Sequence, residues 1–203
     1  MNTIALLDAI RTIALNGLGF TKDPYDVERY EKLLELASQS YEEFIGFDEE
    51  HIRTLLRKDF AYVTPKVGAD AAIFDIEGRV LLIDRTDGTG WCTPCGWLDP
   101  NERPADAAIR EVFEETGLKV KANQLVGVFT NLAGEKNISH SHIAVVYLCE
   151  PIGGQLNQDS DEVLDVKYWQ IDEVPKWHGL QEKLVRAAYK MWSAKEQLPA
   201  FSD

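Results

Sequence analysis

The sequence is short of cysteine, of long apolar runs and of basic residues, and each shortage excludes a class of protein. Three cysteines in 203 residues are too few for a disulfide-stapled secreted fold, so we expect reduced thiols. No apolar run approaches the roughly 18 residues that cross a membrane. The N-terminus lacks a basic segment followed by an apolar run and a small-residue cleavage site, so no signal peptide is expected. These features predict a cytoplasmic protein with no membrane partner.

The charge balance limits the partners further. There are 21 lysines and arginines against 34 aspartates and glutamates, a net charge of −13. Such a chain does not bind nucleic acid or anionic lipid through its overall charge, so a nucleic-acid partner is not expected. A small anionic ligand stays possible, because a bound divalent metal reverses the local field.

The first part of the chain has the periodicity of helices. Apolar residues recur at steps of three and four along residues 27–41, which predicts an amphipathic helix with Asp23-Pro24 as its cap and first turn. We expect an earlier helix to end at Asn16-Gly17 and a third, shorter one to start at Asp48. Three short helices bury only a small core, so this part is expected to need a partner surface.

From residue 66 onward the pattern is that of strands. Residues 71–75 and 80–84 flank a turn and predict a hairpin. We expect a break at Gly153-Gly154, and a closing helix over residues 180–192. Further strands are predicted around Trp91 and at residues 125–130, 143–149 and 163–169.

Residues 105–116 form the most clearly predicted helix. They are mostly strong helix formers, Pro104 suits the first helical turn, and Gly117 suits the position just past the end. Val112 and Ile109 point toward a core.

Three carboxylates share another face of this helix. Glu111, Glu114 and Glu115 are spaced i, i+3 and i+4, so they repel each other unless a cation lies among them. Hard oxygen ligands suit Mg²⁺ or Mn²⁺, and such a metal can bind a diphosphate and activate a water. A merely solvated acidic face is the simpler alternative.

Two other patterns involve the cysteines. Residues 91–95, Trp-Cys-Thr-Pro-Cys, are similar to a thioredoxin redox motif, although that motif should open a helix and a loop follows here. A zinc site built from Cys92, Cys95, His140 and His142 is a weaker alternative, because two histidines separated by one residue do not fit the usual spacing.

Residues 96–118 identify a family. They fit the pattern G-x5-E-x7-R-E-U-x-E-E-x-G-U, where U is a bulky aliphatic residue, at every fixed position, and this pattern is the signature of the Nudix hydrolases. The fixed positions are Gly96, Glu102, Arg110, Glu111, Val112, Glu114, Glu115, Gly117 and Leu118.

The resemblance extends beyond this box. Residues 16–30 resemble the N-terminal helical module of a Nudix subgroup that hydrolyses X-linked nucleoside diphosphates, such as CDP-choline or ADP-ribose; residues 64–67, 165–169 and 173–175 also match it. The resemblance implies an α/β fold, a Nudix α/β/α sandwich with a mixed sheet, preceded by a small helical domain. We expect the helical module over residues 1–62, forming a homodimer, and the Nudix hydrolase domain over residues 66–203.

The resemblance also implies roles for particular residues. Glu111, Glu115 and Glu114 would bind Mg²⁺ or Mn²⁺, with the backbone carbonyl of Cys95. Arg110 and Glu102 would form a structural pair that holds the loop against the helix. Gly96 and Gly117 would be structural residues of the box as well. The general base would be Glu162, in a late loop, or a box glutamate, with Glu114 and Arg110 close to the reaction.

Substrate contacts are less clear from the sequence. Trp97 lies next to the box and is a candidate for stacking on a base, and His142 begins a strand near the expected cleft. The expected reaction cleaves the diphosphate of a nucleoside diphosphate linked to X, giving a nucleoside monophosphate and phospho-X. A non-catalytic nucleotide sensor on the same fold, or an isomerase of the isopentenyl diphosphate type using Cys92 or Cys95, are the alternatives.

Overall fold

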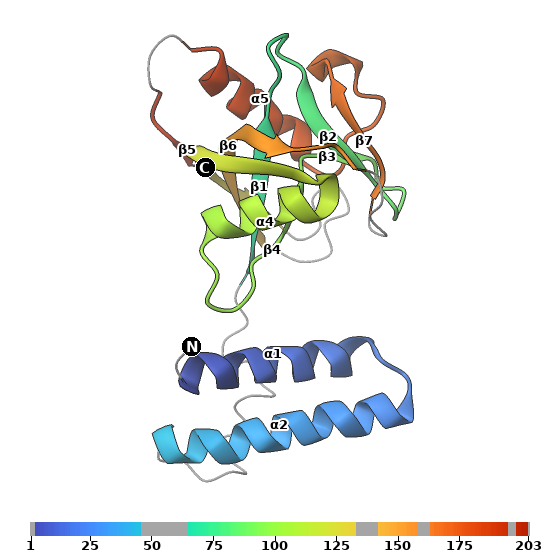
Figure 1. The fold of residues 1–203 in the computed structure, drawn as a ribbon, viewed down its shortest axis with the longest axis vertical. Helices are drawn as coiled ribbons and strands as arrows, with labels where there is room; N and C mark the ends of the chain where they lie inside the picture. The colour runs from blue at the N-terminus through green and yellow to red at the C-terminus, as the bar shows by residue number, and fades with distance from the viewer. Residues whose placement is uncertain (1–2, 46–64, 133–141, 158–162, 195–197, 203) are drawn as a thin grey trace. The chain divides into compact units, whose positions relative to one another are not determined.

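The computed structural model describes residues 3–45, 65–132, 142–157, 163–194 and 198–202 (Figure 1). The chain divides into two compact units, Met1–Thr64 and Pro65–Asp203, each considered by itself below. Within the described ranges, no helix is both long and apolar enough to cross a membrane.

The N-terminal unit is a pair of helices. α1 (Thr3–Phe20) and α2 (Pro24–Ile45) bury a small core centred on Leu7, Ala14 and Leu34. Asp23 caps α2, since its Oδ1 accepts hydrogen bonds from the backbone N–H groups of Tyr25 (2.9 Å) and Asp26 (3.1 Å). The predicted start at Asp23-Pro24 is therefore confirmed.

The predicted end of the first helix at Asn16-Gly17 is wrong, because α1 continues to Phe20. A Cβ atom on Gly17 would lie 2.3 Å from the ring of Tyr30 on α2. Gly17 therefore permits close approach of the two helices and does not end the first one. The short helix expected from Asp48 falls outside the described residues.

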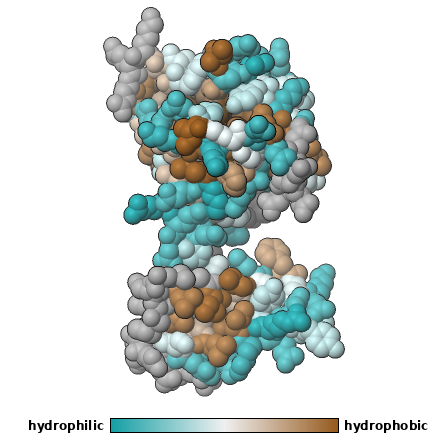
Figure 2. Space-filling model, viewed as in Figure 1, coloured by the Kyte–Doolittle hydropathy of each residue, from teal (hydrophilic) through white to brown (hydrophobic). Residues whose placement is uncertain are grey.

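Apolar side chains also lie on the outside of this unit. Leu6, Ile13 and Phe20 are 43%, 57% and 87% exposed and follow one another at seven-residue intervals along α1. Residues seven apart share one face of a helix, so these three form a stripe. Figure 2 shows hydrophobic side chains gathered on the visible face of the unit. An apolar stripe of this kind is typical of an interaction surface.

The second unit contains two sheets. The five-stranded sheet has parallel pairs (β1 with β6, β5 with β8) and antiparallel pairs, which confirms the predicted mixed sheet. Its order is β4 (Cys95–Trp97), β1 (Lys66–Ile73), β6 (His142–Gly154), β5 (Leu118–Asn131) and β8 (Phe201–Ser202). The three-stranded sheet has the order β3 (Trp91–Cys92), β2 (Val80–Arg85) and β7 (Val163–Trp169).

Helices cover the sheets on both sides (Figure 1). Ala69, Ala71 and Ile73 pack in one core cluster with residues of α4 (Pro104–Thr116), whereas Ala72 and Phe74 pack in a second cluster with α5 (Gln181–Trp192). Successive strand residues point to opposite faces, so this alternation places α4 and α5 on opposite sides. A short 3₁₀ helix, η3 (Ile171–Glu173), precedes α5. The predicted α/β/α sandwich is confirmed.

The turn predicted between residues 71–75 and 80–84 is confirmed, but the two strands do not pair as a hairpin beyond it. The turn is present, with Gly78 at φ 76°, but β1 and β2 belong to different sheets and meet only at the Phe74–Val80 bridge. The alternating pattern identified the strands but contained no information on which strands pair.

The break predicted at Gly153-Gly154 is confirmed in position, because β6 ends at Gly154, although the strand includes both glycines and so extends beyond the predicted residue 149. Gly154 pairs with Leu118 at the start of β5. A Cβ atom on Gly154 would lie 2.4 Å from the carbonyl oxygen of Gly117. The strand predicted at residues 125–130 is correspondingly longer, since β5 begins at once after the box helix.

Candidate active site

α4 begins and ends where the sequence predicts. Pro104 occupies the first turn, and Gly117 follows the helix in the left-handed conformation (φ 73°), donating its N–H to the carbonyl of Phe113 at 2.9 Å. Val112 is fully buried in the core and Ile109 packs against it. The helix is thereby fixed in its rotation about its own axis.

The three glutamates on the acidic face of α4 differ in how far they are buried. Glu111 and Glu115 are only 8% and 5% exposed, whereas Glu114 is exposed. A carboxylate loses hydration when it is buried, so two such groups on one helix need compensating partners. Those partners come from the edge strand β4 and from Arg110.

Glu111 and Glu115 converge on the backbone of β4. Oε2 of Glu115 accepts a hydrogen bond from the N–H of Cys95 at 2.9 Å. The carboxylate of Glu111 lies where a side chain on Gly96 would be, since a Cβ atom there would be 2.1 Å from its Oε1. Only glycine at this position lets the Glu111 carboxylate approach the strand so closely.

Arg110 is the cation among these acids. Its Nε and Nη2 donate to the two oxygens of Glu102 at 2.8 and 2.9 Å, and its Nη1 donates to Glu111 at 2.6 Å and to Glu114 at 3.0 Å. A fifth hydrogen bond joins Nη2 to the carbonyl of Trp97 at 3.2 Å. Hydrogen bonding to Arg110 lowers the pKa of Glu102. The sequence predicted the Glu102 contact but not those to Glu111 and Glu114.

The donor groups of this cluster suit a hard divalent cation. Glu111 and Glu115 supply buried carboxylates, and both touch the short segment that carries the Cys95 carbonyl. Among the described residues, no three acidic, histidine or cysteine side chains already converge as a metal-binding group. Because the two carboxylates lie against the Cys95 segment, Glu111, Glu115 and the Cys95 carbonyl are the groups that could hold a metal, with the Glu114 carboxylate on the same helix face.

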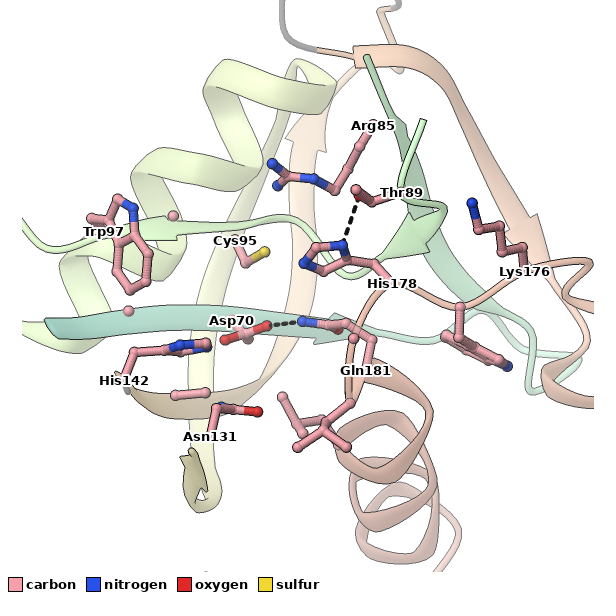
Figure 3. A pocket seen from close by; sticks show the side chains of 17 residues that line it. Asp70, Arg85, Thr89, Cys95, Trp97, Asn131, His142, Lys176, His178 and Gln181 are labelled. Carbon is pink, nitrogen blue, oxygen red and sulfur yellow. Dashed lines mark hydrogen bonds between the residues drawn. The ribbon is translucent and has the colours of Figure 1, made fainter. Parts of the chain in front are cut away.

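A cavity of about 810 Å³ lies against the same strand (Figure 3). It includes Cys95, Gly96 and Trp97 of β4 and is bounded by the N-terminal end of α5 and the segment before it. The other lining residues are Gly68, Asp70, Arg85, Thr89, Asn131, His142, Ala144, Lys176, Trp177, His178, Gly179, Leu180, Gln181 and Leu184. Cys95 and Gly96 thus contribute both to the cavity and to the carboxylate cluster.

Three buried polar residues meet at the cavity. Gln181 donates from Nε2 to Asp70 Oδ1 at 2.6 Å and accepts at Oε1 from the backbone N–H of Thr93 at 3.1 Å. The Thr93 hydroxyl lies 3.0 Å from the same Asp70 oxygen. Burial raises the pKa of Asp70, although the hydrogen bonds from Gln181 and Thr93 oppose this effect.

The opposite side of the cavity is cationic. Asp87 holds Arg85 through Nη2 at 2.8 Å, and Lys176 donates to the carbonyl of Gly88 at 2.8 Å. His178 Nδ1 lies 2.7 Å from the hydroxyl of Thr89 (Figure 3). Burial and the nearby Arg85 lower the pKa of His178, which favours its neutral form. These contacts tie the turn after β2 to the segment before α5.

The cysteine motif does not have the context of a redox site. Cys92 lies on β3 and Cys95 on β4, and the next helix begins only at Pro104. Both thiols are free, and a hydrogen bond with Cys92 together with burial raises the pKa of Cys95. The fold therefore gives the thioredoxin alternative no support. His140 of the zinc alternative falls outside the described residues.

Several of the site residues predicted from the sequence lie at or next to β4. Trp97 and His142 line the cavity, with their rings 5.3 Å apart at nearly a right angle. Glu162 falls outside the described residues. Sequence reasoning missed Asp70 and Gln181. A charged residue within the otherwise apolar strand at residues 69–74 was the available signal for Asp70.

Two protein-family models match the sequence of this chain. A model described as the NUDIX domain matches residues 64–190, and one described as the UDP-X-like, N-terminal oligomerisation domain matches residues 2–56. Together they account for most of both units.

Curated relatives match this chain over part of its length. The Bacillus subtilis protein YjhB, a proposed ADP-ribose pyrophosphatase, is 34% identical over 119 residues, 59% of this chain and 57% of that protein. A MutT-like protein of Streptomyces ambofaciens is 38% identical over 48% of this chain and 59% of that protein. The chain thus spans less than two thirds of these two relatives.

Two solved structures are similar as well. A structure of a UDP-X diphosphatase has a TM-score of 0.61 and 26% identity, covering 96% of this chain and 95% of that one. An ADP-ribose pyrophosphatase from Streptococcus suis has a TM-score of 0.60 and 26% identity, covering 68% of this chain and all of that one. The present chain belongs to the Nudix family, with a UDP-X-like oligomerisation domain ahead of its Nudix domain.

Proposed function

We propose that this protein hydrolyses the diphosphate bond of a nucleoside diphosphate linked to a second group X, of the CDP-choline or ADP-ribose type, giving a nucleoside monophosphate and phospho-X. The observation that carries the proposal is the shared position of Cys95 and Gly96. They contact the Glu115 and Glu111 carboxylates and also line a cavity of about 810 Å³. A linked diphosphate could therefore meet a metal-binding group and a nucleoside-sized cavity at one strand.

The metal proposed for this site is Mg²⁺ or Mn²⁺, held by Glu111, Glu115 and the Cys95 carbonyl, with Glu114 near by. When bound, such an ion neutralises diphosphate charge and lowers the pKa of an attacking water. Gly96 leaves room for the Glu111 carboxylate, and the Cys95 N–H orients Glu115. Arg110 holds Glu111 and the Glu102 loop together, which keeps the ligands in position.

A general base is also proposed, on sequence grounds alone. Glu162 belongs to the late acidic loop, and a box glutamate is the alternative. Glu162→Gln is expected to lower kcat more than it raises KM, because a base acts on the reacting water and not on substrate binding. An unchanged kcat would assign the base to the box helix.

The reaction can be tested with the wild-type protein and Mg²⁺ or Mn²⁺. CDP-choline, ADP-ribose, UDP- and GDP-sugars, dinucleoside polyphosphates and nucleoside triphosphates form the panel, with products separated by chromatography. The proposal predicts a nucleoside monophosphate from at least one linked diphosphate. Turnover of triphosphates alone, or of no compound, would contradict it.

We also propose that the N-terminal unit forms a homodimer. Leu6, Ile13 and Phe20 supply an exposed apolar stripe on α1, within the match to an oligomerisation domain. Light scattering is expected to give twice the chain mass for the wild type. Ile13→Glu should shift the protein toward the monomer, whereas Gln39→Glu, which adds the same charge elsewhere, should not. A monomeric wild type, or a dimeric Ile13→Glu protein, would refute this surface.

A further inference from the structure

Asp70 presents a carboxylate oxygen toward the cavity. Oδ1 takes up both hydrogen bonds of the buried cluster, from Gln181 Nε2 at 2.6 Å and from the Thr93 hydroxyl at 3.0 Å. The carboxylate also interacts with the Cys95 thiol, a weak donor, and electrostatically with His142. Asp70 is 4% exposed and lines the cavity. The second oxygen can therefore accept a stronger hydrogen bond from a bound molecule.

Asn131 is a second polar group at the cavity. The residue is 5% exposed and lines the cavity. Figure 3 shows it on the same side of the cavity as Asp70 and Gln181. Because this carboxamide carries both a donor and an acceptor, it can pair with a polar group of a molecule bound in the cavity.

The same cavity offers flat apolar surface. Trp97 is 45% exposed, its ring lies close to that of His142, and Trp177 also lines the cavity. A planar aromatic ligand could lie against such rings. A carboxylate and a carboxamide beside aromatic rings suit a nucleobase edge, which carries N–H donors next to acceptors.

Phosphate groups fit this part of the cavity poorly, because Asp70 would repel them. Arg85 and Lys176, on the other side, are better placed to attract an anion. The two sides of the cavity thus differ in the chemical group that each one favours.

We propose that Asp70 and Asn131 recognise the base of the nucleotide: Asp70 accepts a hydrogen bond from a base N–H, and the Asn131 carboxamide pairs with the neighbouring polar atom. Gln181 and Thr93 act as positioning residues, since they fix the Asp70 carboxylate. This inference rests on the proposed function for the identity of the ligand as a nucleotide. Beyond that function, it specifies that the base of the nucleotide enters the cavity and that Asp70 and Asn131 determine which base is preferred.

Binding measurements test this proposal without turnover. The full chain is titrated by calorimetry, in Mg²⁺, with CMP, UMP, AMP and GMP, and with ribose 5-phosphate as the ligand that lacks a base. The wild type is expected to bind at least one of the four nucleotides at least tenfold more tightly than ribose 5-phosphate. Equal affinity for ribose 5-phosphate and all four nucleotides would overturn the proposal.

Variants then assign the contacts. Asp70→Asn and Asn131→Ala should each weaken the tightest nucleotide about 10- to 100-fold, the range for a hydrogen bond to a buried or charged group. Their affinity for ribose 5-phosphate should stay unchanged. Asp75→Asn is the matched control, because Asp75 is bound by Arg79 in the turn after β1 and does not line the cavity. Equal weakening of both ligands, or no weakening, would overturn the assignment.

A second measurement needs no variant and so does not depend on how Asp70→Asn folds. The tightest nucleotide is compared with its analogue in which the base N–H groups are methylated. The methylated analogue should bind at least tenfold more weakly to the wild type, and equal binding would overturn the proposal. Base-dependent binding without hydrolysis of any linked diphosphate would contradict the proposed reaction while leaving this inference intact.

Discussion

Replacing Gly96 by alanine should separate catalysis from folding. The added Cβ atom would lie 2.1 Å from Oε1 of Glu111, 2.3 Å from its Cδ and 2.7 Å from its Oε2. Ordinary contacts begin near 3.4 Å, so the carboxylate must move by about 1 Å or more. This movement would also break the 2.6 Å hydrogen bond from Arg110.

The expected effects on activity and stability differ in size. A displacement of about 1 Å at a reacting group can lower the rate roughly 100-fold, so we expect that loss in kcat/KM together with weaker Mg²⁺ dependence. The free energy of unfolding should fall by no more than about 1 to 3 kcal/mol, because the hydrogen bond from Arg110 is lost while alanine suits a strand better than glycine, so the protein should still fold.

The assay measures hydrolysis against Mg²⁺ concentration and urea unfolding of the same preparations. Gly19→Ala is the matched control, because a Cβ atom at Gly19 meets nothing within 4 Å. It should retain full activity. Wild-type turnover and Mg²⁺ dependence in Gly96→Ala would refute the placement of Glu111 as a metal ligand against this strand.

Two further substitutions test the box. Glu102→Gln should lower the free energy of unfolding by about 1 to 3 kcal/mol at pH 7, because it weakens a bidentate pair with Arg110. Arg110 lowers the pKa of Glu102 in the folded state. The stabilisation by this pair is therefore complete above pH 4.5, the ordinary pKa of a glutamate, and is lost as the pH falls through the lowered pKa. A difference in urea unfolding between wild type and Glu102→Gln that does not depend on pH would contradict this. Gly117→Ala should lower stability by about 1 to 2 kcal/mol in the same assay, because φ is 73° and the new Cβ atom would lie 2.6 Å from the carbonyl oxygen of Gln155; unchanged stability would refute that strain.

Elements with local signals could be predicted from the sequence. The box helix is an example, since Pro104 and Gly117 define its ends and the apolar spacing of Ile109 and Val112 defines its buried face. The cap at Asp23 and the closing helix are of the same kind. In each case the determining residues lie within a few positions of the element that they define.

Other features depend on residues far apart in the chain. Gly17 was interpreted as a helix end, yet it permits close approach of Tyr30 on α2. Gly154 does end β6, but it also permits close approach of the Gly117 carbonyl, which the sequence did not indicate. Asp70 and Gln181 are 111 positions apart and meet only in the folded cavity. No local spacing reveals such contacts, so the cavity could not be predicted as the carboxylate cluster was.

The most direct test compares wild type and Glu115→Gln on one linked diphosphate that the panel identifies, with Mg²⁺ present and products resolved by chromatography. The proposed mechanism predicts that the wild type releases a nucleoside monophosphate and phospho-X, and that Glu115→Gln does so at least about 100-fold more slowly while keeping the wild-type circular dichroism spectrum. Equal product release by the two proteins would contradict the role of the box carboxylates in the reaction.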